Sequence, residues 1–228
     1  MGYKLKSVVR LSVLANMFSC RWLGMDVIIG GVASIDEVQS CEMAFSNKLL
    51  EQPSGVALIT REQPESFQLE QSGFIVTDNP RLTFIKILNY LDSVVGFDTW
   101  DLPAIIDSSA IIGTNAVIES GCVVGANSII EHNVVLHSGT RIGENCRIRS
   151  CSSIGGDGFG FERLDDGTPL RFPHLGGVVI GDNVEIGALN SIARGSLSDT
   201  VILNDVKTDN LVHIAHNCFV NESALITA

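Results

Sequence analysis

The sequence predicts a mainly β protein, a parallel β-helix preceded by a small α+β domain, and three observations support this fold class. An aliphatic residue recurs at every sixth position from Ile106 onward, with a small or slim residue four positions after each. Hydrophobic residues make up 45% of the chain but aromatic residues only 6%, which suits a thin interior of Ile and Val. Residues 1–101 lack the period, so we expect them to form a separate domain.

The six-residue period is the strongest signal in the chain. It fits neither an α-helix nor a simple strand and is typical of a parallel β-helix. The first run of aliphatic positions is unbroken: Ile106, Ile112, Ile118, Val124, Ile130, Leu136, Ile142, Ile148 and Ile154. The period returns, with one slip of four residues, at Ile180, Ile186, Ile192, Ile202, Thr208, Ile214, Val220 and Ile226. Three hexads would close a triangular coil of about 18 residues, so these seventeen hexads predict roughly six coils stacked about 4.8 Å apart.

The N-terminal region shows helix and strand signals instead. Residues 4–18 suggest an amphipathic helix, and residues 27–35, 56–60 and 74–76 suggest strands. Asn79-Pro80 should open a helix that runs to about residue 91, because proline is tolerated in the first turn. We expect the junction at residues 101–103.

The β-helix is expected to span residues 102–228, with one insertion. Residues 155–179 interrupt the hexads, and they are rich in glycine and proline, so we predict an outward loop. The chain stops at Ala228 in mid-coil without a polar cap. Solenoids need caps, so we expect either a truncated chain or a partner that covers this end.

Charge and cysteine usage limit the possible partners and compartments. The net charge is −11, which argues against nucleic acid as a main partner. The six cysteines include no CxxC pair, so we expect free thiols and a cytoplasmic protein. The basic residues ahead of residues 11–18 resemble a signal peptide, but the apolar run is short and Asn16 interrupts it. No stretch reaches 18 apolar residues, so no transmembrane segment is expected.

Specific motifs carry a resemblance to a known family. They are Gly155-Gly156-Asp157-Gly158-Phe159-Gly160-Phe161, Val179-Ile180-Gly181-Asp182-Asn183-Val184-Glu185-Ile186-Gly187-Ala188 and Asp209-Asn210-Leu211-Val212-His213-Ile214-Ala215-His216-Asn217. In order and spacing over residues 3–228, the chain resembles UDP-3-O-acylglucosamine N-acyltransferase, a hexapeptide-repeat enzyme of lipid A biosynthesis. The segment Asp78-Asn79-Pro80-Arg81, with Phe84, resembles the family's N-terminal domain.

This resemblance implies a fold, an assembly and a reaction. The β-helix would be left-handed and the protein a homotrimer with active sites between subunits. The reaction would transfer a hydroxyacyl chain from acyl carrier protein to the 2-amine of a UDP-sugar, and residues 1–101 would bind the uridine. We expect no cofactor and no metal.

His216 is the candidate catalytic residue. It fits the family's catalytic position in Ala215-His216-Asn217, although a lone histidine would ordinarily be read as a surface residue. Amine acylation needs a base with a near-neutral pKa, and histidine suits that role. Asp209 is a candidate orienter of His216, or else lies in a solvated turn. If the four-residue slip is a bulge, His216 and Arg194 take equivalent places on adjacent coils.

The candidate substrate-binding residues lie in both domains. Arg194 and Asn217 flank the His216 segment, and Phe159 and Phe161 either line an acyl groove or pack back on the prism. The family's uridine motif usually reads Phe-x-x-Asn-x-x-Tyr. Here Phe45 and Asn47 are one residue closer, and no Tyr follows, so uracil stacking is in doubt.

Three alternatives remain at this stage. His132 and His137 have the spacing of zinc ligands in hexapeptide carbonic anhydrases, but residues 104–131 offer no further histidine. The chain could instead be a catalytically silent or partial trimeric scaffold. It could also be a CoA-dependent sugar-nucleotide N-acetyltransferase.

Overall fold

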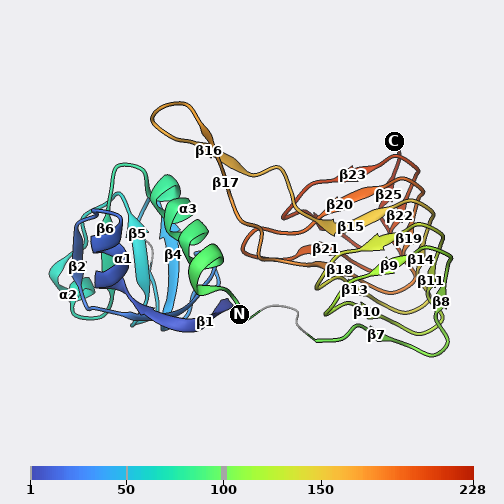
Figure 1. Ribbon diagram of the computed structural model, residues 1–228, viewed down its shortest axis with the longest axis horizontal. Coiled ribbons are helices and arrows are strands. Elements are labelled where there is room, and N and C mark those ends of the chain that lie inside the picture. The colour runs from blue at the N-terminus through green and yellow to red at the C-terminus, as the bar shows by residue number, and fades with distance from the viewer. Residues whose placement is uncertain (1, 50, 99–101) are drawn as a thin grey trace. The chain divides into compact units, whose positions relative to one another are not determined.

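The computed structural model describes residues 2–49, 51–98 and 102–228, and the chain divides into two compact units (Figure 1). One unit contains Met1–Thr99 and Gly160–Pro173, and the other contains Trp100–Phe159 and His174–Ala228. Each unit is described by itself below. Of the expected junction at 101–103, residue 101 lies outside the described residues.

The first unit is built on one mixed sheet of six strands in the order β1-β3-β4-β5-β6-β2. The strands are β1 (Tyr3–Arg10), β2 (Trp22–Gly24), β3 (Ile28–Val32), β4 (Glu42–Ser46), β5 (Ala57–Thr60) and β6 (Gly73–Val76). β3 to β6 pair in parallel, while β1 and β2 close the two edges in antiparallel pairing. β5 is buried along its whole length, as expected of a central parallel strand.

Helices and a hairpin complete this unit. The helical segments are α1 (Leu11–Met17), α2 (Ser66–Leu69), α3 (Pro80–Tyr90) and the π-helical η1 (Leu91–Val95). The Asn79 side chain caps α3 by accepting the N–H of Leu82 at 3.0 Å, with Pro80 in the first turn. α3 packs against β4 and β5.

Residues 160–173 belong to this unit as an antiparallel hairpin of β16 (Phe161–Arg163) and β17 (Pro169–Arg171). Two contacts attach the hairpin to α3. Arg81 Nε donates to Glu162 Oε2 at 2.9 Å, and Asn89 Nδ2 donates to the Arg171 carbonyl at 2.9 Å. The predicted outward loop at 155–179 therefore contains a folded hairpin, which the sequence did not indicate.

The prediction of a helix over residues 4–18 is wrong in its first half, because residues 3–10 form strand β1. β1 pairs with β3, and the pairing places Tyr3 opposite Val32 and Arg10 opposite Ile28. β1 is an edge strand of the sheet, which explains why its sequence resembled that of an amphipathic helix. Most of the β1 side chains are exposed, so the strand carries basic residues and lacks a clear alternation.

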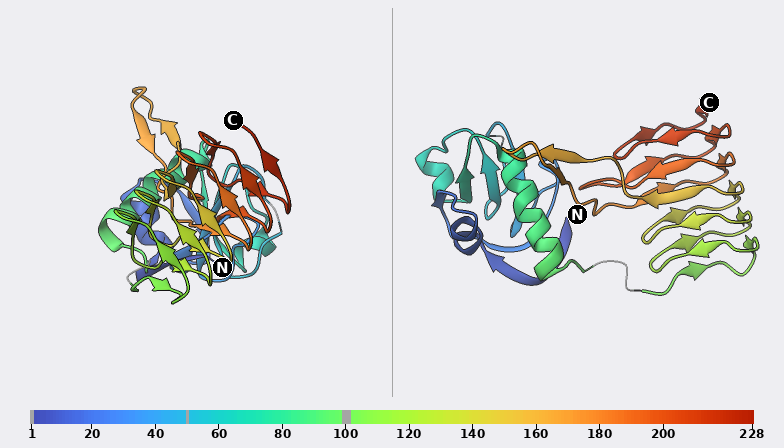
Figure 2. Two further views of the ribbon diagram at one scale, coloured as in Figure 1. Left: turned by 90° about the vertical axis from the view of Figure 1, so that its right-hand side faces the viewer. Right: turned by 45° about the horizontal axis from the view of Figure 1, so that its top comes forward.

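The second unit is a parallel β-helix with three faces (Figure 2). Sheet one contains β7 (Ile105–Ile106), β10 (Val123–Val124), β13 (Arg141–Ile142), β18 (Val178–Ile180), β21 (Thr200–Ile202) and β24 (Phe219–Val220). Sheet two contains β8 (Ile111–Ile112), β11 (Ile129–Ile130), β14 (Arg147–Ile148), β19 (Glu185–Ile186), β22 (Lys207–Thr208) and β25 (Leu225–Ile226). Sheet three contains β9 (Val117–Ile118), β12 (Val135–Leu136), β15 (Ser153–Gly156), β20 (Ser191–Ala193) and β23 (His213–Ile214).

The predicted hexads are confirmed, because each of these strands holds one hexad position. In each two-residue strand the second residue points inward. Inward residues of adjacent coils pair directly, as Val124 does with Ile106 and Ile142. Between β20 and β21 the chain bulges outward. Ile192 still pairs with Ile214, which confirms the register that a four-residue bulge predicts.

The corners of the prism follow from backbone conformation and side-chain size. Asparagines occupy left-handed corners, as Asn115 and Asn133 do at φ 59° and 58°. Their side chains stack on adjacent coils, with Asn115 Nδ2 3.4 Å from Asn133 Oδ1. Cys122 and Cys146 fill small buried corner positions as free thiols, and burial raises the pKa of both. These thiols are therefore packing groups rather than nucleophiles.

Within the described residues, no helix combines the length and the apolar character needed to cross a membrane.

The inward column predicts a sharp difference between two isoleucine substitutions. Ile130 is fully buried, whereas Ile111 points outward on the preceding coil and is 60% exposed. Ile130→Ala should lower the free energy of unfolding by about 2–5 kcal/mol, because it leaves a cavity between coils. Ile111→Ala should cost much less. Chemical denaturation monitored by circular dichroism compares the two, and equal losses would contradict the stacked-core account.

Candidate active site

His216 lies at the corner that follows β23, two residues after the inward Ile214, and its side chain is half-buried. Two groups contact its Nδ1 atom. Asn217 Nδ2 lies 3.0 Å away, and Ser196 Oγ lies 3.4 Å away. The ring is therefore held on one edge by its own corner and by the bulge of the coil before it.

The bulge and the His216 corner are tied together by Asn217. Its Oδ1 accepts the N–H of Ser196 at 2.7 Å, and its own N–H donates to Thr200 Oγ1 at 3.0 Å. Asn217 adopts φ 60°, a conformation that asparagine tolerates better than most residues. Asn217 therefore has two roles. It adopts the left-handed conformation that the corner requires, and its side-chain amide binds the neighbouring coil.

The contacts at Nδ1 bear on which nitrogen carries the proton. The amide nitrogen of Asn217 can only donate, so that contact requires a lone pair on Nδ1. The hydroxyl of Ser196 can also accept, and it would favour the tautomer with the proton on Nδ1. Only the second tautomer leaves Nε2 free to accept a proton from a substrate.

His174 is a site residue that the sequence analysis missed. It is buried, at 6% exposure, and its ring centre lies 5.0 Å from that of His216 in an edge-to-face arrangement with an interplanar angle of 72°. It stands outside the hexads, directly after the hairpin of residues 160–173, so no periodic signal marks it. The one available indication was a histidine within a glycine-rich interruption.

Gly158 lies in close contact with both histidines. A Cβ atom at this position would lie 2.7 Å from His216 Cδ2 and 2.9 Å from His174 Nε2. Such distances are well inside van der Waals contact. The glycine of the Gly-Asp-Gly motif is therefore required by the close approach of the two rings.

Arg194 takes the place on its coil that His216 takes on the next, as the register Ser191–His213 and Ile192–Ile214 shows. Its guanidinium group faces the preceding coils. Nε donates to the Gly155 carbonyl at 2.7 Å, and Nη2 donates to the Ser138 carbonyl. Arg194 therefore fixes Gly155, the residue directly before the Gly-Asp-Gly segment beside the site.

Asp209 is not brought to His216 within this chain. It follows β22 on sheet two, whereas His216 follows β23 on sheet three. Its carboxylate oxygen accepts the N–H of Asn210 at 2.7 Å, and its side chain is exposed.

The candidate aromatic residues belong to different units of the chain. Phe159, in the β-helix unit, is 88% exposed. Phe161, on β16 of the first unit, is half-buried, and the guanidinium carbon of Arg171 lies 4.8 Å from its ring centre. Phe161 thus packs beside Arg171 in the first unit, which is neither of the two expected placements, while the ring of Phe159 is exposed to solvent.

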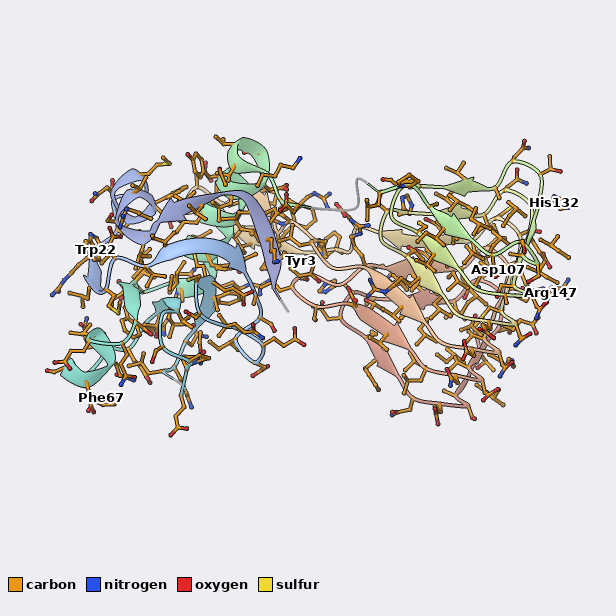
Figure 3. The ribbon with its side chains drawn as sticks, turned by 90° about the horizontal axis from the view of Figure 1, so that it is seen from below. Tyr3, Trp22, Phe67, Asp107, His132 and Arg147 are labelled. Atoms are coloured by element: carbon orange, nitrogen blue, oxygen red, sulfur yellow. The ribbon has the colours of Figure 1, made fainter. Side chains whose placement is uncertain are left out.

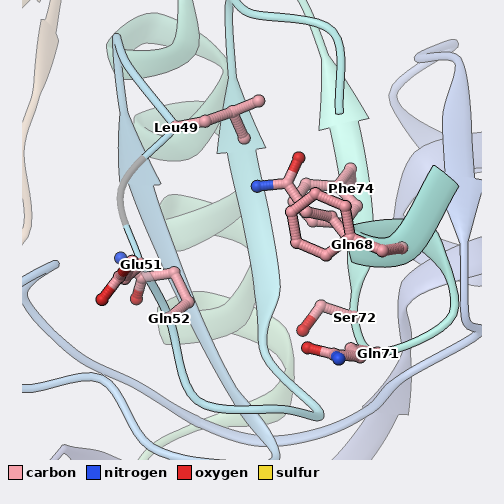
Figure 4. A pocket seen from close by; sticks show the side chains of 8 residues that line it. Leu49, Glu51, Gln52, Gln68, Gln71, Ser72 and Phe74 are labelled. Atoms are coloured by element: carbon pink, nitrogen blue, oxygen red, sulfur yellow. The ribbon is translucent and has the colours of Figure 1, made fainter. Parts of the chain in front are cut away.

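The candidate uridine residues lie at the end of β4. Phe45 is half-buried, with its ring centre 4.8 Å from that of the buried Phe84. Asn47 follows the strand and is exposed. The first unit also contains a pocket of about 430 Å³, and neither Phe45 nor Asn47 is among the residues that line it: Leu49, Glu51, Gln52, Phe67, Gln68, Gln71, Ser72 and Phe74 (Figure 4).

His132 and His137 make different contacts. His132 lies on the outside of the coils, and its Nδ1 accepts the N–H of Thr114 at 2.8 Å (Figure 3). His137 faces Glu119 and Ser153 on sheet three. Among the described residues, no group of three or more His, Cys, Asp or Glu side chains is placed to hold a metal ion.

Comparison with known proteins agrees with the coiled architecture and the motifs. Residues 121–156 match the family model described as bacterial transferase hexapeptide (six repeats). UDP-3-O-acylglucosamine N-acyltransferase from Xanthomonas axonopodis is 52% identical over 80 residues, which cover 35% of this chain and 23% of that protein. The enzyme of the same name from Chlorobium chlorochromatii is 49% identical over 81 residues, covering 36% and 23%.

Among solved structures, LpxA from Acinetobacter baumannii is similar with a TM-score of 0.48 and 26% identity, covering 57% of this chain and 48% of that one. Francisella novicida UDP-N-acetylglucosamine acyltransferase has a TM-score of 0.44 and 30% identity, covering 55% and 42%.

The chain spans about a quarter of the length of the curated relatives that it matches. Within that stretch the identity is about half, and residues 121–156, which match the family model, lie in the coils described above. Residues 121–156 therefore match the hexapeptide-repeat model, and the relatives that the chain resembles over about a third of its length are UDP-3-O-acylglucosamine N-acyltransferases.

Proposed function

We propose that this protein is an N-acyltransferase of lipid A biosynthesis. It would move a hydroxyacyl chain from acyl carrier protein to the 2-amine of UDP-3-O-acylglucosamine, acting in the cytoplasm as a homotrimer. The single observation that carries the proposal is the position of His216. The histidine of the Ala-His-Asn motif is held at Nδ1 by Ser196 and Asn217 and packed against His174.

The proposed chemistry needs one base and a fixed geometry. His216 accepts a proton from the substrate ammonium, and the neutral amine attacks the thioester carbonyl carbon. His216 releases this first proton to water, takes a second proton from the nitrogen of the tetrahedral intermediate, and gives it to the departing thiolate as the C–S bond breaks. This role requires the tautomer with the proton on Nδ1, in which the Ser196 hydroxyl accepts from Nδ1 and the Asn217 amide no longer donates to that atom.

The remaining candidate residues receive supporting roles. Arg194 would hold the Gly-Asp-Gly segment beside the reacting groups through its bond to Gly155. The exposed ring of Phe159 would contact the acyl chain. Asp209 is proposed as an orienter of His216 only in the assembled trimer, because within one chain it accepts the N–H of Asn210. Phe45 and Asn47 remain the proposed uridine contacts.

The proposed assembly is tested by the mass of the protein in solution. A homotrimer should sediment at about three times 24.5 kDa. Analytical ultracentrifugation at micromolar concentration measures this. A monomer alone would contradict both the trimer and any site shared between subunits.

The proposed base is tested by His216→Ala. The transfer rate should fall at least about a hundredfold, because a positioned general base contributes roughly 10² to 10⁴ in rate. Transfer from hydroxyacyl-acyl carrier protein to UDP-3-O-acylglucosamine is followed by mass spectrometry. His213→Ala is the matched control, since His213 is exposed and donates from Nδ1 to the Ser191 carbonyl at 3.0 Å.

Two outcomes of that assay would count against the proposal. A His216→Ala rate within about tenfold of wild type would reject His216 as the base. Absence of transfer by the wild type would reject the proposed reaction for this chain and favour a catalytically silent scaffold.

The close approach at Gly158 gives a third test. Gly158→Ala should reduce the transfer rate by about a hundredfold, because a displacement of about 1 Å can cost that much and the new Cβ must push the His216 ring away. Gly30→Ala is the control, since a Cβ there would meet its neighbours no closer than 3.8 Å. An unchanged rate in folded Gly158→Ala would show that the position of the ring does not limit the reaction.

A further inference from the structure

A second group of reactive side chains lies on sheet three, on the coils four to two before the His216 corner. It contains Glu119, His137 and Ser153, which follow or begin β9, β12 and β15. Glu119 Oε1 lies 3.2 Å from His137 Nδ1, and His137 Nε2 lies 3.1 Å from Ser153 Oγ. None of these three residues takes part in the site around His216.

The register of the coils explains why the three side chains meet. Val135 pairs with Ser153 in the ladder, and His137 is two residues beyond Val135, so both side chains point outward from the same face. Glu119 precedes His137 by one full coil. Gly155 stands opposite His137, where a Cβ would lie 3.4 Å from the histidine's own Cβ and 2.4 Å from Thr140 Oγ1. A side chain at position 155 would clash with Thr140, so this corner beside His137 requires a glycine.

Hydrogen bonds from Ser138 hold the Glu119 carboxylate that contacts the His137 imidazole. Glu119 Oε2 accepts both the N–H of Ser138, at 2.8 Å, and its hydroxyl, at 3.0 Å. Burial raises the pKa of Glu119, but the hydrogen bonds from Ser138 and the charge and hydrogen bond of His137 outweigh it and lower the pKa. The side chain is therefore an ionised acceptor at neutral pH.

An ionised Glu119 at Nδ1 selects the tautomer of His137. The proton sits on Nδ1, so the lone pair of Nε2 faces the Ser153 hydroxyl. A nucleophile within hydrogen-bond reach of a base that a third group orients is the arrangement of an activated serine.

The surroundings leave space for a carbonyl group and supply a positive charge. A Cβ at Gly156 would lie 3.5 Å from His137 Nε2 and 3.8 Å from Ser153 Oγ, so this glycine keeps the approach to both atoms open. Arg194 donates to the carbonyls of Gly155 and Ser138, the residues that adjoin the group. Its guanidinium charge would stabilise an oxyanion formed there.

We propose that Ser153, His137 and Glu119 form a second catalytic site, which hydrolyses short acyl esters through a serine-bound acyl intermediate. Ser153 Oγ attacks the ester carbonyl carbon while His137 Nε2 takes its proton. The bond to the alcohol oxygen breaks, and His137 gives that oxygen the proton. Water then attacks the acyl-serine and passes a proton to His137, the acid leaves, and His137 returns the proton to Ser153 Oγ. Glu119 is a positioning residue.

The partial exposure of the group fixes the class of substrate. The side chains of His137 and Glu119 are 31% and 40% exposed, so the site is an open surface rather than a deep pocket. An open site selects activated esters with small acyl groups and does not enclose a long chain.

The test uses two probes on the full chain, a fluorophosphonate and p-nitrophenyl acetate. Mass spectrometry of tryptic peptides should find the phosphonate adduct on Ser153, and Ser153→Ala should abolish both the adduct and ester hydrolysis. His137→Gln should slow adduct formation at least about a hundredfold, and Glu119→Gln at least about tenfold. Ser191→Ala is the matched control, because Ser191 pairs with Ser153 on the next coil and should leave both readouts unchanged.

Thermal unfolding of every variant separates chemistry from structure. Folded variants that lose labelling would support the second site. Absence of an adduct on Ser153 in the wild type, or equal labelling rates in wild type and folded His137→Gln, would overturn it. Neither readout depends on amine acylation at His216, so the two proposals fail or stand separately.

Discussion

The parallel ladder between inward aliphatic residues is the constraint on which the rest of the β-helix depends. One coil cannot bury its own inward side chains, because each needs a neighbour above and below. Val124 between Ile106 and Ile142 shows the rule. The first coil has a neighbouring coil on one side only, and its inward residues Ile106 and Ile112 remain 42% and 39% exposed. Stability therefore grows with stacking, and the register of every outward side chain follows from the inward ones.

The chemistry of the molecule is concentrated where that register is interrupted. The long excursion after β15, the bulge after β20 and the His216 corner after β23 all lie at the edge where sheet three gives way to sheet one. Glu119 and His137 occupy the same edge on earlier coils. An interruption at this edge leaves the inward residues in place and frees outward positions. The coils thus provide rigid support for residues that themselves have no part in the core.

Comparison of sequence and structure shows which features a period can predict. The hexads predicted the strands, the pairing of Ile192 with Ile214 and the buried corner cysteines, because each reflects the repeating need to fill one interior. His174 and Ser196 lie in segments without a period, so their approach to His216 depends on how two excursions fold back. Asp209, predicted as either an orienter of His216 or a residue of a solvated turn, follows β22 on sheet two and accepts the N–H of Asn210 within this chain. Handedness is not encoded in the period, and the expectation of a left-handed coil rested on the resemblance alone.

The coil length has a consequence for how such a chain can change. Stacked positions such as Asn115 and Asn133 are 18 residues apart. Gain or loss of one whole coil would therefore shift everything beyond it by about 4.8 Å along the axis and leave each face aligned. Gain or loss of a single hexad would turn everything beyond it by one face and carry His216 away from the edge that holds Arg194 and Gly158. A whole turn gained outside the two sites leaves each site intact, whereas a third of a turn gained between Arg194 and His216 would move these two residues to different faces.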